Sequence, residues 1–205
     1  APVGPGAIAG PGRVREPVAD PITPIRMPAE MPVAAPGPGP GPSRARGASA
    51  RSRISGAQRP WKRIVVHHSD DTSGCAAKYN AEHLAKGWEN GLGYHFVIGN
   101  GTQSGDGEVE VGPRWVTQIQ GAHAKTPDNC YNEQGIGICL VGDFEHGTGR
   151  PTRAQMEALS RLCRWLMERY SISSDRVMGH ADCKPTACPG RNFPWSDLRR
   201  RLAGM

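Results

Sequence analysis

The sequence lacks the features of an integral membrane protein and of a small disulfide-rich protein. No segment comes close to the roughly 20 apolar residues that a helix needs to span a bilayer. The first residues show no basic segment followed by an apolar stretch, so a secretion signal either has been removed or was never present. Six cysteines in 205 residues are too few for a disulfide framework, although one or two disulfides remain compatible with an exported protein.

An excess of positive charge is missing from most of the chain. The formal net charge is +6, but residues 1–60 alone hold eight arginines against three acidic residues. Residues 61–205 hold 17 basic and 16 acidic residues, so this part is nearly neutral. A protein that binds nucleic acid usually gathers basic residues on its folded domain. We therefore expect no nucleic-acid partner and attribute the basicity to the N-terminal segment.

The N-terminal segment has few of the apolar residues from which a folded core is built. Thirteen of the 19 prolines lie in residues 1–60, and Pro and Gly alternate over residues 36–42. Because such a composition cannot offset the entropy of ordering, we predict a disordered Pro/Gly/Arg-rich tail or linker over residues 1–58 and one folded domain over residues 59–205. The basic stretch at residues 44–53 is interpreted as a solvated spacer, with adhesion to an anionic envelope polymer as the alternative.

Apolar patterns typical of strands and helices alternate along the second part of the chain. The β-branched run at residues 64–66 predicts a buried strand that ends at His67 and His68. Further strands are expected at residues 94–98, 136–141 and 176–178. Helices are expected at residues 153–170 and from about 195 to 202. This alternation predicts a single α/β domain whose mixed central sheet is flanked by helices.

Two helices have recognisable start signals. Thr152 and Gln155 have the spacing of a capping box at the start of the long helix. Another helix is expected from Ala77, with Ser73 as its N-cap, because apolar residues recur there at a helical period. The apolar positions of this helix are 77, 81, 84, 85 and 88.

Two histidines and one cysteine stand out as candidate metal ligands. His67 and His180 each follow an expected strand, and Cys188 comes eight residues after His180. Two imidazoles and a thiolate suit Zn²⁺, and three protein ligands leave a fourth position for water, as is typical of a catalytic zinc. Because 113 residues separate the two histidines, the site can form only where the sheet brings two strand ends together.

A second arrangement of metal ligands is local. His180, Cys183 and Cys188 have a spacing that looks like a structural zinc knuckle. This arrangement has no evident fourth ligand nearby and leaves His67 unexplained, so we favour the first.

The remaining cysteines allow several interpretations. Cys183 can instead form a disulfide with Cys75 or Cys130, since spacing does not determine connectivity. Cys139 and Cys163 lie in apolar strand and helix contexts, where buried free thiols are the ordinary expectation.

Six short segments follow one another in a fixed order. They read Val-Val-His-His-Ser at 65–69, Gly-Tyr-His-Phe at 93–96, Gly-Ala-His-Ala at 121–124, Gly-Ile-Gly-Ile at 135–138, Gly-His at 179–180 and Pro-Thr-Ala-Cys-Pro at 185–189. The ordered set resembles the type 2 amidase family, which includes phage lysozyme-like amidases and peptidoglycan recognition proteins. The resemblance covers about residues 61–202 and does not extend to the N-terminal segment.

The resemblance implies a zinc-dependent N-acetylmuramoyl-L-alanine amidase, which cuts the amide between the glycan and the stem peptide of peptidoglycan. It implies that His67, His180 and Cys188 hold Zn²⁺ and that Tyr94 is catalytic. Thr186 stands two residues before the cysteine, where catalytic recognition proteins also carry Thr, and is expected to position the reacting oxygen or water. A non-catalytic peptidoglycan-binding module of the same fold is the alternative.

The implied substrate also suggests where the protein acts. Peptidoglycan or its soluble muropeptides would be met in the cell envelope or outside the cell, so we expect an exported protein, and we expect it to be a monomer. Trp88, Trp115 and Trp195 are expected to pack in the fold, with a place in a glycan groove as the alternative.

The other histidines are expected to have lesser roles. His68 and His95 each follow a candidate site residue on an expected strand, so their side chains should face the other way. His123 lies in a loop of small residues, where substrate contact and ordinary hydrogen bonding are both open. His83 and His146 are interpreted as surface residues.

Overall fold

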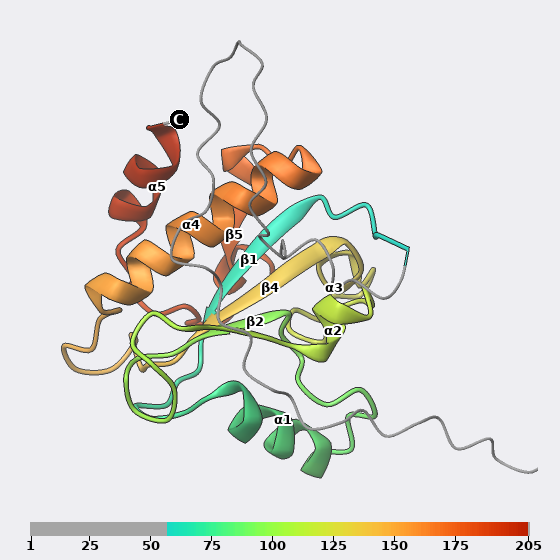
Figure 1. Ribbon diagram of the computed structural model, residues 1–205, viewed down its shortest axis with the longest axis horizontal. Coiled ribbons are helices and arrows are strands. Elements are labelled where there is room, and N and C mark those ends of the chain that lie inside the picture. The colour runs from blue at the N-terminus through green and yellow to red at the C-terminus, as the bar shows by residue number, and fades with distance from the viewer. Residues whose placement is uncertain (1–56, 205) are drawn as a thin grey trace, which may run out of the picture.

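The computed structural model describes residues 57–204, whose centre is a five-stranded sheet with the order β3-β2-β4-β1-β5 (Figure 1). The strands are β1 (Arg63–His68), β2 (Phe96–Ile98), β3 (Val109–Val111), β4 (Gly135–Leu140) and β5 (Val177–Gly179). Strand β1 pairs in parallel with β4 and β5, β2 pairs in parallel with β4, and β3 runs antiparallel to β2. The expected α/β class with a mixed sheet is confirmed. The predicted tail over residues 1–58 lies almost entirely outside the described residues.

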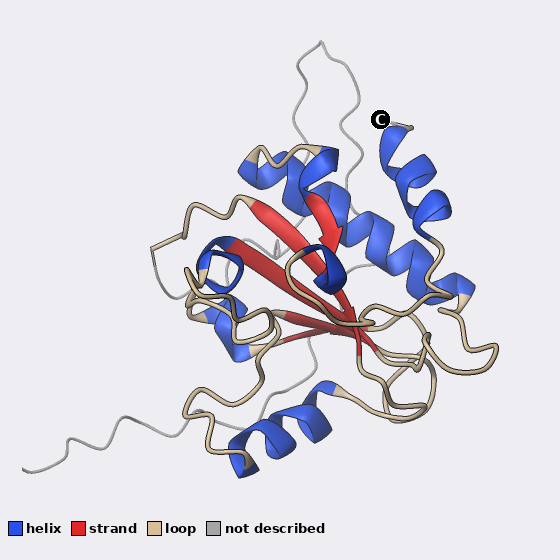
Figure 2. Ribbon diagram, turned by 180° about the vertical axis from the view of Figure 1, so that it is seen from behind, coloured by secondary structure: helices blue, strands red, loops and turns tan. Residues whose placement is uncertain are grey.

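Helices cover both faces of this sheet, as Figure 2 shows from behind. They are α1 (Ala76–Ala85), α2 (Pro113–Val116), α3 (Cys130–Gln134), α4 (Arg153–Tyr170) and α5 (Trp195–Ala203), with short 3₁₀ turns at Ser174–Arg176 and His180–Asp182. Helix α1 packs on one face, and α4 and α5 pack on the other. Within residues 57–204, no helix has the length and apolar character needed to cross a membrane.

The alternation of side chains along the strands divides the core into two clusters. In β4, Ile136, Ile138 and Leu140 belong to the larger cluster with α4 and α5, whereas Cys139 belongs to the smaller cluster with α1. His67 is the register partner of Cys139 on the neighbouring strand β1. Because register partners on adjacent strands point to the same side, His67 projects from the face that α1 covers.

Helix α4 begins with the expected capping box. Thr152 Oγ1 accepts from the amide of Gln155 at 3.0 Å, and Gln155 Oε1 accepts from the amide of Thr152 at 3.0 Å. The side-chain amide of Gln155 also donates to the carbonyls of Ile98 and Val141, which ties the helix start to the ends of β2 and β4. The buried stripe comprises Met156, Leu159, Leu162, Cys163, Leu166 and Met167. Burial of each leucine contributes about 1.5–3 kcal/mol to folding.

Helix α1 forms where it was expected, but its orientation differs from its apolar pattern. The apolar residues that indicate the helix lie on its exposed side, where Leu84 and Trp88 are 50% and 36% exposed. Its buried side carries Tyr79 and His83 instead. A Cβ at Gly74 would lie 2.0 Å from the Tyr79 hydroxyl, so the tyrosine occupies space that only glycine leaves open.

Several element boundaries also differ from the sequence prediction. The N-cap of α1 is Cys75, whose sulfur accepts from the amide of Lys78, and the prediction of Ser73 is wrong. Strand β2 begins at Phe96, so Tyr94 lies in the loop before it. Strand β3 and helices α2 and α3 were not predicted, because elements of three to five residues are too short for a periodic pattern.

All six cysteines lie within the described residues, and all are free thiols. Neither of the disulfides considered for Cys183 is formed. Its sulfur donates to the carbonyl of Gly179 at 3.5 Å instead. Cys139 and Cys163 are buried, as expected.

Of the three tryptophans considered for a glycan groove, two are packed in the fold. Trp115 contacts Phe96, with ring centroids 4.8 Å apart, and Trp195 contacts Phe193 at 4.7 Å. Trp88 stays partly exposed.

Candidate metal and catalytic site

His67 and His180 meet because β1 and β5 are adjacent parallel strands. Val66 pairs with Gly179, so the residue that follows each of these lies at the same edge of the sheet. The two imidazole rings have centroids 4.5 Å apart. His67 is buried, and His180 is partly buried at the start of a 3₁₀ turn.

Cys188 reaches the two histidines from a loop that returns to the end of β1. Its sulfur lies 3.6 Å from Nδ1 of His67 and accepts from the amide of His68 at 3.4 Å. The carbonyl of Cys188 accepts from the amide of Ala181 at 2.8 Å, which holds this loop beside His180. One ligand-type atom from each of His67, His180 and Cys188 lies within 4.8 Å of the others, so this group could hold a metal ion.

The electrostatic environment keeps the two imidazoles neutral. Burial lowers the pKa of His67 well below its ordinary value, and the neighbouring His123 and His180 lower it further. Burial, followed by the charge of Lys184, lowers the pKa of His180 to about 4. Both rings therefore present lone pairs at neutral pH, as metal ligation requires.

The thiol of Cys188 is in the opposite condition. Burial raises its pKa to about 12, so without a cation the sulfur keeps its proton at neutral pH. A bound cation would deprotonate it, since a coordinating thiol is deprotonated outright.

The donor set and its surroundings fit a metal ion. Nε2 of His180 is buried and has no hydrogen-bond partner among the described residues. Two imidazole nitrogens and a sulfur also form the kind of ligand set that Zn²⁺ prefers over harder cations. The local alternative is wrong, because the thiol of Cys183 faces the carbonyl of Gly179 and does not join the group.

Tyr94 lies over the ring of His67, with centroids 5.2 Å apart. It is half-buried against the smaller core cluster, next to Cys139. Burial raises the pKa of the Tyr94 hydroxyl well above its ordinary value, and Cys139 and Cys188 raise it further. The phenol is therefore protonated at neutral pH and can act only as a hydrogen-bond donor or a neutral acceptor.

Thr186 lies on the exposed side of the Cys188 loop. Its hydroxyl oxygen accepts from the amide of Cys188 at 3.3 Å, which braces the turn that presents the sulfur. The hydroxyl hydrogen is not used in this contact, so Thr186 can still donate to another group.

His123 is buried and contacts His67 directly. Its Nδ1 lies 3.1 Å from Nε2 of His67, and its Nε2 lies 3.2 Å from the carbonyl of Gly135. Of the two roles that were open for this residue, the geometry displays hydrogen bonds to the protein on both ring nitrogens.

The remaining histidines divide as follows. His68 faces the opposite side from His67 and accepts from the amide of Phe144. His95 is buried between the amide of Gly137 and the carbonyl of Ile119. His146 is exposed, as expected.

The prediction of a surface position for His83 is wrong. This histidine is buried, its Nδ1 accepts from the amide of Gly93 at 3.0 Å, and its ring stacks on Trp88 at 4.3 Å. It thereby fixes the backbone just before Tyr94. The signal in the sequence was its spacing of four residues from Tyr79, which puts both on one side of α1.

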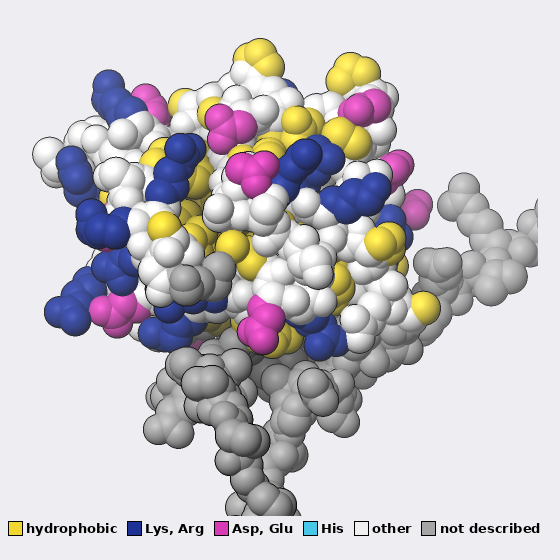
Figure 3. All heavy atoms as spheres, turned by 90° about the horizontal axis from the view of Figure 1, so that it is seen from above, with side chains coloured by type: hydrophobic (Ala, Val, Ile, Leu, Met, Phe, Trp, Pro, Cys, Tyr) yellow, Lys and Arg dark blue, Asp and Glu magenta, His cyan; other side chains and the backbone are white. Residues whose placement is uncertain are grey.

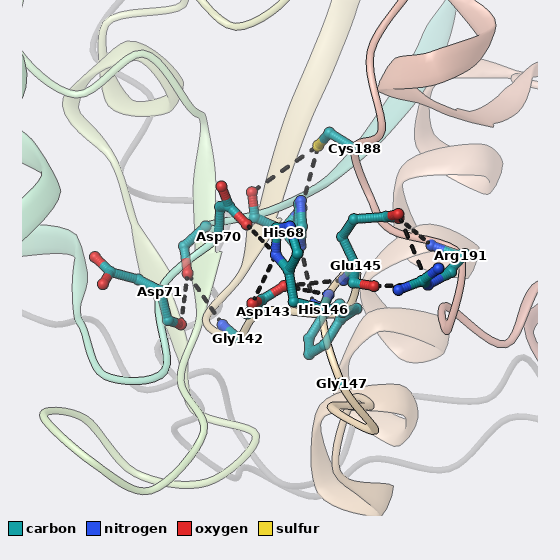
Figure 4. A network of polar contacts seen from close by, with 12 residues as sticks. His68, Asp70, Asp71, Gly142, Asp143, Glu145, His146, Gly147, Cys188 and Arg191 are labelled. Atoms are coloured by element: carbon teal, nitrogen blue, oxygen red, sulfur yellow. Dashed lines mark hydrogen bonds and ion pairs between the residues drawn. The ribbon is translucent and has the colours of Figure 1, made fainter.

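A polar network holds the loops around the site (Figure 4). Asp143, after β4, accepts from the amides of Glu145 and His146. Arg191, just beyond Cys188, donates from its backbone amide to Oε2 of Glu145 at 2.8 Å and from Nε to the carbonyl of Glu145 at 2.8 Å. These contacts attach the Cys188 loop to the end of the neighbouring strand.

The same network contains a second group of ligand-type atoms, from His68, Asp70 and Asp143. The amide of Phe144 donates to Nδ1 of His68, and burial lowers the pKa of this histidine. A neutral ring with Nδ1 as acceptor carries its proton on Nε2, so His68 has no lone pair for a cation. We therefore assign this group to loop structure.

Charges are mixed on the molecular face drawn in Figure 3, where basic side chains lie among acidic ones. This view agrees with the near-neutral balance of residues 61–205.

Comparison with known proteins gives one family. The family model described as N-acetylmuramoyl-L-alanine amidase matches residues 57–191. A short peptidoglycan-recognition protein of Drosophila simulans is 31% identical over 144 residues, which span 65% of this chain and 71% of that protein. The endolysin of Klebsiella phage KP32 is 37% identical over 111 residues, spanning 52% of this chain and 64% of the endolysin.

A solved structure has the same fold. The N-acetylmuramoyl-L-alanine amidase LysC from Clostridium intestinale URNW superposes with a TM-score of 0.59 at 32% identity. The superposition covers 70% of this chain and 87% of LysC.

Proposed function

Because the chain belongs to the N-acetylmuramoyl-L-alanine amidase family, we propose that it uses Zn²⁺ to hydrolyse the amide between N-acetylmuramic acid and L-alanine. The substrate in this proposal is peptidoglycan or its soluble muropeptides. The observation that carries the proposal is the convergence of His67, His180 and Cys188, with Tyr94 lying over the ring of His67.

In this proposal His67, His180 and Cys188 hold the zinc ion. When bound, zinc supplies a Lewis acid that polarises the amide carbonyl and activates water near neutral pH. The two neutral imidazoles offer lone pairs, and Cys188 gives up its proton on binding.

Tyr94 is assigned to stabilising the developing oxyanion. Its protonated phenol can donate a hydrogen bond to the carbonyl oxygen as that oxygen gains negative charge. Its half-buried position beside His67 supports this role, because a donor in a partly dehydrated site interacts more strongly than one in water.

Thr186 is assigned to orienting the reacting oxygen or water. Its oxygen is engaged by the amide of Cys188, which leaves the hydroxyl hydrogen free to donate. A threonine hydroxyl is a poor base, so we assign it no proton abstraction.

The alternative is a peptidoglycan-binding module of the same fold without activity. The similarity to the peptidoglycan-recognition protein of Drosophila simulans supports this alternative, whereas the similarity to LysC supports the enzyme. The presence of Cys188 with Tyr94 and Thr186 favours the enzyme. An enzyme of this kind would act in the cell envelope or outside the cell, and we propose that it does so as a monomer.

The deciding experiment is digestion of purified peptidoglycan followed by mass spectrometry. The proposal expects stem peptides with a new L-alanine amino terminus, their loss after chelation, and their return when Zn²⁺ is added back. Retention on peptidoglycan without release of any peptide would establish the binding module instead.

A further inference from the structure

We propose that His123 is a positioning residue that sets the tautomer of His67, so that Nδ1 of His67 is the atom that binds the metal. The inference rests on the proposed metal site, but it concerns only how this chain prepares one of its ligands. His123 would act through His67 and would not touch the substrate.

The argument starts from the one group in the chain of contacts whose role is certain. The carbonyl of Gly135 can only accept a hydrogen bond, and Nε2 of His123 lies 3.2 Å from it. This nitrogen must therefore carry the ring proton. In a neutral imidazole the other nitrogen, Nδ1, is then an acceptor.

The same reasoning passes to His67. Nδ1 of His123 accepts, and Nε2 of His67 lies 3.1 Å from it, so Nε2 of His67 is the donor. The lone pair of the neutral His67 ring is consequently on Nδ1. Nδ1 is also the nitrogen that lies 3.6 Å from the sulfur of Cys188, so the prepared lone pair faces the other ligands.

The argument requires that His123 be neutral, and its surroundings ensure this. The residue is 8% exposed. Burial is the main cause that lowers the pKa of its ring to about 3. No carboxylate appears among the causes that act on His123, so nothing nearby compensates a positive charge.

The ring of His123 is also sterically fixed. A Cβ at Gly121 would lie 2.3 Å from Cδ2 of His123, and a Cβ at Gly137 would lie 2.4 Å from the same atom. Both glycines thus leave a slot that the imidazole fills. The backbone is held as well, because Oδ1 of the buried Asn132 accepts from the amides of His123 and Ala124 at 2.9 and 2.8 Å.

These contacts explain what His123 does for the site. A hydrogen bond from Nε2 of His67 fixes the orientation of the ligand ring and raises the basicity of Nδ1. Loss of such an outer partner typically costs about 10–100-fold in metal affinity. The slot, the carbonyl and the pinned backbone together are what a positioning role requires.

The test compares H123L with H123N in the full chain. Leucine fills part of the slot but offers no acceptor to His67, whereas Oδ1 of asparagine can take the place of Nδ1. Zinc affinity is measured by competition with a chelator. We expect H123L to bind zinc about 10–100-fold more weakly and H123N to recover part of this loss. H146N changes an exposed histidine and should leave the affinity unchanged.

A second measurement does not depend on any variant being folded. Nitrogen-15 correlation spectra of the wild-type protein report which nitrogen of each histidine carries a proton. The inference expects the proton of His67 on Nε2 and that of His123 on Nε2, with and without zinc. A proton on Nδ1 of His67 in the metal-free protein would overturn the inference, and so would equal zinc affinity of folded H123L and wild type.

These outcomes separate the inference from the proposed function. If the wild type binds zinc and digests peptidoglycan while H123L keeps full affinity, only the inference fails. If zinc binding depends on His123 but no peptide is released, the amidase proposal fails and the inference stands.

Discussion

The sulfur of Cys188 lies 3.6 Å from Nδ1 of His67, although 121 residues separate them in the chain. The contact depends on two features of the fold: the end of β1 at His67 and the loop that follows the 3₁₀ turn at His180. A Cβ at Gly190 would lie 2.3 Å from the carbonyl carbon of Phe144, so glycine is needed where this loop passes close to the end of β4.

Removal of the Cys188 sulfur should abolish zinc binding and activity. C188A leaves two imidazoles, and its loss of zinc affinity should exceed the about 10–100-fold expected for an outer partner. C183S is the matched control, because Cys183 contacts the carbonyl of Gly179 and not the metal ligands. Zinc content after dialysis and peptide release are the measurements. A zinc-loaded, active C188A protein would remove Cys188 from the site.

Y94F should lower kcat while leaving KM and zinc affinity nearly unchanged. The variant removes only the phenol hydrogen bond to the oxyanion, and loss of one such donor typically costs about 100–1,000-fold in kcat. Steady-state kinetics on a soluble muropeptide would measure both constants. An unchanged kcat would exclude Tyr94 from catalysis.

Zinc binding should release about one proton between pH 6 and 8. Burial raises the pKa of Cys188 to about 12, so its thiol is protonated over this range, whereas His180, with a pKa of about 4, is already neutral. The apparent zinc affinity should therefore rise by about tenfold per pH unit. A pH indicator in weakly buffered solution would measure the release directly, and its absence would show that another group replaces the thiolate.

The metal-free protein should lose stability as the pH falls below about 6.5. The pKa of His123 is about 3 in the folded protein, and those of His67 and His95 are also lowered by burial, whereas an unfolded histidine titrates near about 6.5. Below about pH 6.5 the unfolded chain binds more protons, so each buried histidine costs up to about 1.4 kcal/mol per pH unit until its folded pKa is reached.

Urea unfolding in the presence of a chelator at pH 8, 6 and 5 would measure this loss. H146N is the matched control, since His146 is exposed and should not contribute to the slope. An equal free energy of unfolding at pH 8 and pH 5 would contradict the prediction.

Much of the fold could be predicted where the pattern was long. Helix α4 has 18 residues, a capping box at Thr152 and Gln155 and a continuous apolar stripe, so periodicity and local chemistry agree. Helix α1 shows the limit of the same reasoning. Its apolar side is exposed, because Tyr79 and His83 fit the space beside the sheet better than Leu84.

The sequence by itself determined the residue types of the site and their order along the chain. His67, Tyr94, His180, Thr186 and Cys188 could be picked out because imidazole and thiolate suit zinc and because the segments around them resemble a known family. Neither argument contains distances. Only the tertiary structure brings the sulfur and the two imidazoles together, since that depends on β5 pairing with β1 rather than with another strand.

The tertiary structure also decided the part played by His123. In the sequence this residue is one histidine in a loop, with no pattern that distinguishes a substrate contact from a hydrogen bond within the protein. The folded chain places it between a carbonyl and a candidate ligand, in a slot made by two glycines. Hydrogen-bond direction is a property of neighbours in space, and residues 67, 123 and 135 become neighbours only when the sheet has formed.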